Sequence, residues 1–236
     1  MGMNYQLLEL MHLQAAALYS HDAEGRLLRV NEPDPNQPAP RFFLARSAHG
    51  NLWRTRYDLP PELAAELARL AASEPVVADL PPFPLHQGGY VALLEQYAPV
   101  TRIYAGPAYW LPELAPSSRT VTITPQNEEA LLRTHIAEMI GQPSEHAPIV
   151  VVVEDGVAVA GCVTARTTDK VAEAGVLTVK SYRGRGYAAE VVRGWAAQVR
   201  ASRRLPLYST WWENTASQRV AAKLGAVQYG VWFSLT

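Results

Sequence analysis

Apolar and polar positions alternate along much of the first half of the chain, and the alternation predicts two short hairpins there. Elsewhere in this half, apolar residues recur at spacings of three and four, as in Leu63, Leu67 and Leu70, which is typical of a helix with one buried face. We find no catalytic motif in this half, and we expect an α+β arrangement. The expected helices are 4–18, 61–73 and 90–97, and the expected strands are 17–20, 26–30, 42–46, 52–57 and 100–104.

The second half shows a clearer order of strands and helices. Two valine-rich strands flank Asp155-Gly156, a dipeptide that strongly favours a two-residue hairpin turn. Asn127 precedes a run that opens with acidic residues, which predicts a helix with Asn127 as its N-cap. The expected strands are 121–124, 149–153, 157–166, 174–179, 207–211 and 227–235, and the expected helices are 125–140, 187–202 and 216–224.

Proline clusters separate these segments, because proline fixes φ and offers no backbone donor. The cluster of Pro107, Pro112 and Pro116 is the best candidate for a domain boundary, which predicts domains over 1–117 and 118–236. In the first of these, residues 22–31 faintly resemble the start of a PAS sensor domain, although a plain hairpin gives the same pattern.

Composition narrows the classes of function. The chain has 236 residues, 48% of them hydrophobic, and a formal net charge of −1, which indicates a folded protein without a broad basic surface for nucleic acid. No apolar run is long enough to span a membrane, no secretory signal is recognisable, and we expect a cytoplasmic protein. The single Cys162 excludes an intramolecular disulfide, and the histidines lack metal-ligand spacing, so we expect no metal.

Residues 175–190 carry the most specific chemistry. A β-branched strand enters a glycine-rich turn that opens directly into a helix, which aims unpaired N–H groups and the positive end of the helix dipole at one point. Gly184 and Gly186 let an anion approach the backbone, and Arg183 and Arg185 add positive charge. Only three lysines occur in the chain, so arginine, which suits bidentate phosphate contacts, supplies nearly all of its positive charge.

Three interpretations of this turn are compatible with the residues. It could be a strand–helix turn with solvated arginines, a dinucleotide-binding fingerprint of the form Gly184-x-Gly186-x-x-Ala189, or a diphosphate site for coenzyme A. The fingerprint fits badly, because the acidic residue expected about 20 positions later is absent.

The sequence here resembles the GNAT superfamily of N-acetyltransferases. The segment Arg183-Gly-Arg-Gly-Tyr-Ala188 matches the family pattern Gln/Arg-x-x-Gly-x-Gly/Ala, and residues 207–214 and 216–225 resemble the family's next strand with its asparagine and a helix ending in Leu-Gly. The resemblance covers about residues 119–236 and is to a bacterial branch with an extra N-terminal region. It implies a mixed, mostly antiparallel sheet flanked by helices, in which the first half could be a degenerate copy that completes the acceptor site.

The resemblance also implies a cofactor site for acetyl-CoA, with two neighbouring strands that splay apart around the pantetheine. Val179 would lie near the N–H that binds the developing oxyanion. Asn214 and Ser217 would contact the cofactor from the other side. The cofactor-binding residues implied in this way are Leu177, Thr178, Val179, Arg183, Gly184, Arg185, Gly186, Tyr187, Ala188, Asn214 and Ser217.

The acid and base are less well defined. Glu173 stands at the start of the strand where the family often places a base, and Glu213 is a second candidate. The position at which the family usually has an acidic tyrosine is Ala221, a departure that puts the standard acid in doubt. The tyrosines that could substitute are Tyr182, Tyr208 and Tyr229, among which we select Tyr208 as the catalytic candidate.

The resemblance therefore predicts an N-acetyltransferase in which the amine of a small-molecule or peptide acceptor attacks acetyl-CoA directly. The alternative is a coenzyme-A-binding sensor or scaffold without catalysis, which the residue at Ala221 favours. A nucleotide-dependent oxidoreductase is a third candidate. The sequence does not identify the acceptor, and it leaves room for a homodimer.

Overall fold

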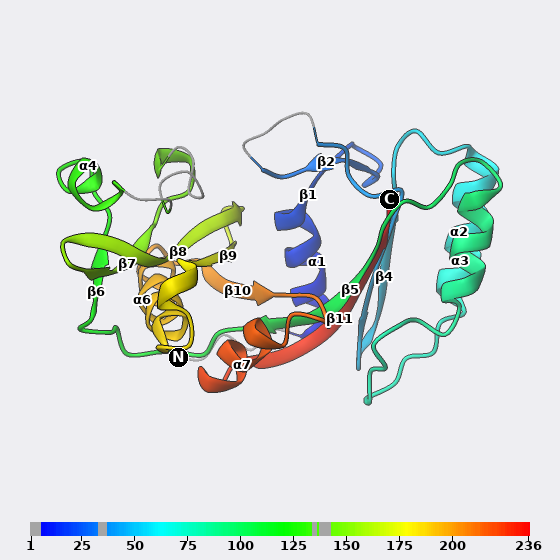
Figure 1. The fold of residues 1–236 in the computed structure, drawn as a ribbon. Coiled ribbons are helices and arrows are strands. Elements are labelled where there is room, and N and C mark those ends of the chain that lie inside the picture. Colours follow the sequence, from blue (N-terminus) through cyan, green and yellow to red (C-terminus); the bar gives the residue numbers. More distant parts are fainter. Residues whose placement is uncertain (1–5, 33–36, 134–135, 137–142) are drawn as a thin grey trace. The chain divides into compact units, whose positions relative to one another are not determined.

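A computed structural model describes residues 6–32, 37–133, 136 and 143–236. The chain divides into two compact units that interleave along the sequence (Figure 1). The first unit comprises residues 1–109, 209–215 and 228–236, and the second comprises 110–208 and 216–227. The boundary predicted between 117 and 118 assumed consecutive halves, whereas here the end of the chain returns to the first unit.

The first unit is built on a sheet of order β4-β3-β11-β5. The last strand of the chain, β11, pairs antiparallel with β3, with Val231 opposite Arg46 and Leu235 opposite Phe42. A separate pair, β1 with β2, forms the first predicted hairpin. The elements of this unit are α1 (Leu7–Leu18), β1 (Tyr19–His21), β2 (Leu27–Val30), β3 (Phe42–Ser47), β4 (Gly50–Thr55), α2 (Pro61–Ala72), α3 (Gln87–Glu95), β5 (Ile103–Trp110) and β11 (Val227–Leu235).

Burial of apolar side chains between this sheet and helices α2 and α3 forms the core of the first unit. Phe42 stacks on Tyr90, with ring centroids 4.6 Å apart, and Tyr90 also contacts Phe233. The hydroxyl of Tyr90 donates to the buried carboxylate of Glu74, which also accepts the backbone N–H of His86 at 2.8 Å. Burial beside Glu74 raises the pKa of Tyr90 well above its ordinary value, so the tyrosine stays neutral.

Gly106 lies in the first unit, where β5 runs close to the segment 210–212. The N–H groups of Thr210 and Trp212 donate to the carbonyls of Pro107 and Ala105, at 3.3 and 3.2 Å. A Cβ atom on Gly106 would lie 1.8 Å from the carbonyl oxygen of Thr210. This oxygen belongs to the backbone, so a change of side-chain rotamer cannot relieve the clash.

We therefore expect Gly106→Ala to lower the free energy of unfolding by about 2 kcal/mol or more, measured as a fall in Tm. Gly88→Ala is the matched control, because a Cβ at Gly88, in α3, meets nothing within 4 Å, and alanine favours the helix. An unchanged Tm for Gly106→Ala would contradict this close backbone packing.

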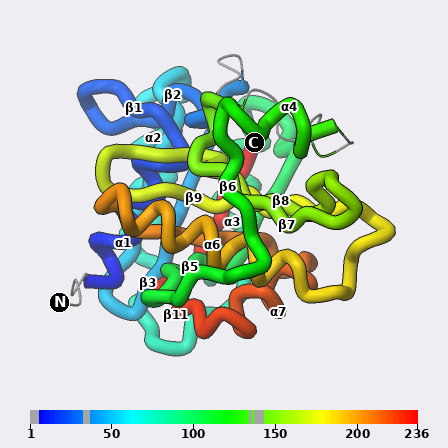
Figure 2. The backbone as a smooth tube through the Cα atoms, turned by 90° about the vertical axis from the view of Figure 1, so that its left-hand side faces the viewer, coloured from blue at the N-terminus to red at the C-terminus, as the bar shows by residue number. Residues whose placement is uncertain are grey.

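The second unit is built on a sheet of order β10-β9-β8-β7-β6. The pairs β6–β7, β7–β8 and β8–β9 are antiparallel, whereas β10 runs parallel to β9. Helix α6 packs on β7, β8 and β9, as Figures 1 and 2 show. The elements are β6 (Thr120–Thr122), α4 (Glu128–Leu131), η1 (Pro143–Glu145), β7 (Val150–Glu154), β8 (Val157–Thr167), β9 (Val171–Thr178), η2 (Lys180–Tyr182), α6 (Tyr187–Ala201), β10 (Leu205–Ser209) and α7 (Thr215–Lys223).

Most predicted elements are confirmed, including the mixed, mostly antiparallel sheets flanked by helices. The β7–β8 turn has left-handed backbone at both Asp155 (φ 50°) and Gly156 (φ 76°), as the predicted two-residue turn requires. One local prediction is wrong, because Pro107 lies inside β5 and not in a loop. Asn127 takes the predicted N-cap position of α4, but its side chain makes no capping hydrogen bond.

Asn127 instead folds back on the preceding turn. Its side-chain oxygen accepts the N–H of Thr124 at 2.8 Å, and its amide donates to the carbonyl of Thr122. The predicted helix 125–140 is described only as the short α4. Residues 134–135 and 137–140 of that prediction lie outside the described part of the chain.

Candidate functional site

The strands β9 and β10 pair over a short segment and then separate. Val171, Ala172 and Glu173 of β9 face Leu205, Pro206 and Leu207 of β10, and the pairing ends there. Strand β9 continues for five further residues, 174–178, which are half-buried, whereas the paired residues 171–173 are buried. The edge of β9 that faces away from β8 has no strand partner over these residues in the described part of the chain.

The hydrogen bonds between β9 and β8 show which backbone groups face this open edge. The N–H of Val179 donates to the carbonyl of Val159 at 2.9 Å, and Thr178 faces Ala160 in the antiparallel register. Since hydrogen-bonded and non-hydrogen-bonded pairs alternate, the N–H groups of Val176 and Thr178 point away from β8. The carbonyl of Thr178 also points away from β8, because it accepts the Nε–H of Arg183 at 3.2 Å.

The glycine loop, residues 183–188, follows β9 and the short η2 turn and begins α6. Gly184 (φ 80°) and Gly186 (φ 84°) both have left-handed backbone, which glycine adopts without strain. Gly186 is the N-cap of α6 and, having no side chain, leaves the first N–H groups of the helix without a capping hydrogen bond from this position. The sequence therefore folds here as predicted, into a turn that exposes the first N–H groups of a 15-residue helix.

Within the described residues, none of the N–H groups of residues 184–188 donates to a protein acceptor; the next one along, of Ala189, donates to the carbonyl of Gly186 at 3.2 Å. Arg183 and Arg185 are exposed, and the guanidinium of Arg185 lies over the ring of Tyr182, 4.8 Å from its centroid. Free N–H groups, glycines and guanidinium groups together fit a diphosphate.

Tyr187, at the start of α6, fixes the loop to the neighbouring β7–β8 hairpin. Its side chain is buried, and its hydroxyl donates to the carboxylate of Glu154. The guanidinium of Arg119 lies over the Tyr187 ring and 3.8 Å from the same carboxylate. The side chain of Tyr187 is thus structural, while its N–H stays available to a ligand.

Glu173 and Tyr208 flank the point where β9 and β10 separate. Glu173, paired with Leu207, is the last β9 residue in the parallel pairing, and its side chain is 2% exposed. Tyr208 follows Leu207, so its side chain lies on the opposite face of the sheet from that of Glu173. The Tyr208 hydroxyl lies 2.5 Å from Oγ of Ser217 in α7, one helical turn before the buried Ala221.

The remaining predicted site residues are placed as follows. Leu177 packs its side chain against a buried cluster that includes Ile149, Val151 and Val163. Asn214 lies in the turn before α7 and belongs to the first unit, where its N–H donates to the carbonyl of Trp211. Cys162 is buried in β8, and burial raises the pKa of its thiol, which disfavours a nucleophilic thiolate.

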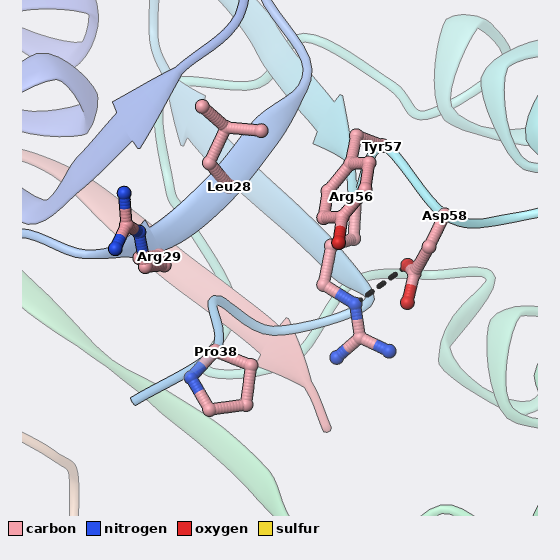
Figure 3. A pocket seen from close by; sticks show the side chains of 6 residues that line it. All are labelled: Leu28, Arg29, Pro38, Arg56, Tyr57 and Asp58. Carbon is pink, nitrogen blue, oxygen red and sulfur yellow. Dashed lines mark hydrogen bonds and ion pairs between the residues drawn. The ribbon is translucent and has the colours of Figure 1, made fainter. Parts of the chain in front are cut away.

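A cavity of about 460 Å³ lies in the first unit (Figure 3). Arg56 on its wall is already committed, because its Nε–H donates to Asp58 at 2.7 Å and its Nη1–H to the carbonyl of Ala39. None of the predicted site residues lines this cavity. The lining residues are Leu28, Arg29, Pro38, Arg56, Tyr57 and Asp58.

Among the residues that the structure describes, no group of three or more His, Cys, Asp or Glu side chains is arranged to hold a metal ion. No helix in the described segments has the length and apolar character needed to cross a bilayer.

Comparison with protein families gives a match to the acetyltransferase (GNAT) domain over residues 91–227. This segment covers more than half of the chain and includes β9, the glycine loop, α6, β10 and α7. No curated protein matches the sequence.

Solved structures similar to this chain include several acetyltransferases. One is an acetyltransferase of the GNAT family from Colwellia psychrerythraea, which is 16% identical in sequence. The alignment covers 100% of this chain and 99% of that structure, with a TM-score of 0.47. A GCN5-related N-acetyltransferase-like protein from Streptococcus suis is 13% identical, with 87% of both chains covered and a TM-score of 0.49. The chain spans 63 to 65% of the length of other structures from the family.

Proposed function

The chain belongs to the GNAT acetyltransferase family, and on that premise we propose that it is an N-acetyltransferase that uses acetyl-CoA and an amine acceptor. The separation of β9 from β10, directly before the glycine loop, carries this proposal. It places an open strand edge and a group of free N–H donors one after the other along a single stretch of chain.

The glycine loop would bind the diphosphate of the cofactor. The N–H groups of residues 184–188 would donate to its oxygens, and Arg183 and Arg185 would supply neutralising charge. The pantetheine would lie along the open edge of β9, where the backbone groups of Val176 and Thr178 are directed. We also propose that Asn214 and Ser217 contact the cofactor from the side opposite β9.

Acetyl-CoA supplies a thioester, whose carbonyl carbon an amine can attack. We assign the N–H that stabilises the developing charge on the carbonyl oxygen to Thr178 or Val176. The N–H of Val179, near which the sequence analysis placed this role, already donates to Val159. A donor of this kind, fixed in a strand, contributes several kcal/mol when it is aimed in advance, about 2.7–4 in a measured case.

Glu173 would act as the general base. Its carboxylate lies at the point where the strands separate, and it would accept a proton from the acceptor's ammonium group before attack. The hydroxyl of Tyr208 would protonate the leaving thiolate from the opposite face, held in place by Ser217. This arrangement would supply the acid that the residue at Ala221 cannot.

We expect Tyr208→Phe to lower kcat roughly tenfold, with the Kd for acetyl-CoA changed less than twofold. Ser217→Ala should lower kcat less, by about two- to threefold, because it only orients the hydroxyl. Steady-state kinetics with calorimetric Kd values measure both effects. A kcat for Tyr208→Phe within twofold of the wild type would show that the hydroxyl has a structural role only.

A thiol-release assay tests the proposed activity. The intact protein is incubated with acetyl-CoA and a broad panel of small amines and peptides, and free CoA is measured with a thiol reagent. Amine-dependent release is expected for at least one class of acceptor. Tight binding of CoA without turnover on any amine would instead support a non-catalytic CoA-binding module, which the residue at Ala221 favours.

The finer aspects of the function follow from the same premise. We propose a small-molecule or peptide amine as acceptor, a cytoplasmic location, a bacterial source and no resident metal, and we leave open a homodimer. Binding of NAD(P) without binding of CoA would revive the oxidoreductase alternative, which otherwise lacks its expected acidic residue.

A further inference from the structure

Lys223, the last residue of α7, places its ammonium group at the glycine loop. A Cβ atom built on Gly186 would lie 3.2 Å from Nζ of Lys223, so the ammonium lies directly beside the N-cap of α6. Lys223 and Gly186 belong to the same compact unit.

The charged groups of the loop that this ammonium approaches are positive. The start of α6 carries the positive end of its dipole, and Arg183 and Arg185 stand on the adjoining turn. Within the described segments, no carboxylate forms an ion pair with either arginine or with Lys223, and this includes Glu190 in the first turn of α6. Positive groups brought together without a counter-charge repel one another.

An anion bound at the glycine loop would remove this repulsion. The guanidinium groups belong to residues of the loop, whereas Lys223 comes from α7, a different element. Positive charge from two elements, next to several free N–H groups, matches an anion larger than a single phosphate, such as a diphosphate.

We propose that Lys223 is a binding residue for the diphosphate of the cofactor, and that it makes the site selective for nucleoside diphosphate ligands over those with a single phosphate. This inference rests on the proposed function and deepens it. The 3′-phosphate of CoA could meet the same ammonium, so the experiment separates the two sources of phosphate.

Lys223→Met keeps the apolar stem of the side chain and removes its charge. Calorimetric Kd values are measured on the intact protein for CoA, for dephospho-CoA, which lacks the 3′-phosphate, and for phosphopantetheine, which has one phosphate. We expect Lys223→Met to weaken CoA and dephospho-CoA equally, by about 10- to 50-fold, and phosphopantetheine by less than threefold. The dependence of the CoA affinity on salt should also become weaker.

Lys170→Met is the matched control, because it makes the same substitution at an exposed lysine before β9, roughly 25 Å of strand from the glycine loop. It should leave all three Kd values within twofold of the wild type. If Lys223→Met binds CoA as the wild type does, the inference is wrong while the CoA site stands. If Lys223→Met weakens the binding of CoA but not that of dephospho-CoA, the lysine binds the 3′-phosphate and the diphosphate assignment is wrong. A wild-type protein that binds no CoA would overturn the proposed function and, with it, this inference.

Discussion

Gly186→Glu should weaken CoA binding more than a hundredfold while leaving the protein folded. The backbone of Gly186 has φ 84°, so any side chain there is strained, and a Cβ would lie 3.2 Å from Nζ of Lys223. The new carboxylate would form an ion pair with this ammonium and place negative charge where the diphosphate binds. Repulsion and loss of a cation both act against the ligand.

The control for this variant is Gly25→Glu, in the β1–β2 turn of the first unit. Gly25 has φ 78°, so the substitution imposes the same kind of backbone strain outside the glycine loop. Each substitution should lower the free energy of unfolding by about 1 kcal/mol, seen as a fall in Tm. Only Gly186→Glu should lose affinity for CoA. A Kd within threefold of the wild type for Gly186→Glu would remove the loop from the CoA site.

Glu173→Gln should lower kcat/KM at least about 100-fold for the amine found in the panel, with the Kd for acetyl-CoA unchanged. The amide is nearly isosteric with the carboxylate but cannot accept the ammonium proton. The pH profile tests the role directly, because activity of the variant should rise with pH as the free amine becomes available without a base. The activity of the wild type should depend less on pH over the same range, because its base accepts the ammonium proton.

Glu213→Gln decides between the two carboxylates that the sequence offered as a base. Glu213 is exposed in the turn before α7, and its substitution should change kcat/KM less than twofold. If Glu173→Gln keeps more than a third of the activity, Glu173 is a structural residue opposite Arg166 in the β8–β9 register rather than the base.

Local signals in the sequence were sufficient for the hairpins and for the glycine loop. Asp155-Gly156 and the glycines at 184 and 186 need left-handed backbone, and only a few residue types supply it, so these turns are predictable from the residues. Pro107 shows the opposite case. It lies within β5 because its carbonyl accepts from Thr210, more than 100 residues away, and no local pattern encodes that partner.

The candidate site was predicted only in part, because local signals in the sequence identify consecutive elements but not contacts between distant ones. The strand, the loop and the helix are consecutive, and the sequence placed them correctly. The position of Lys223 beside Gly186, and the contact between Tyr208 and Ser217, depend on how α7 packs in three dimensions. The same holds for the pairing of β11 with β3, which interleaves the two units along the chain.

Amide hydrogen exchange on the intact protein, with and without saturating CoA, tests the location of the cofactor most directly. The account predicts slower exchange in peptides covering residues 174–188, where the N–H groups of Val176, Thr178 and residues 184–188 are free of protein acceptors, and no change in the β3–β4 hairpin. Saturating CoA, verified by calorimetry, that leaves 174–188 unprotected would contradict it.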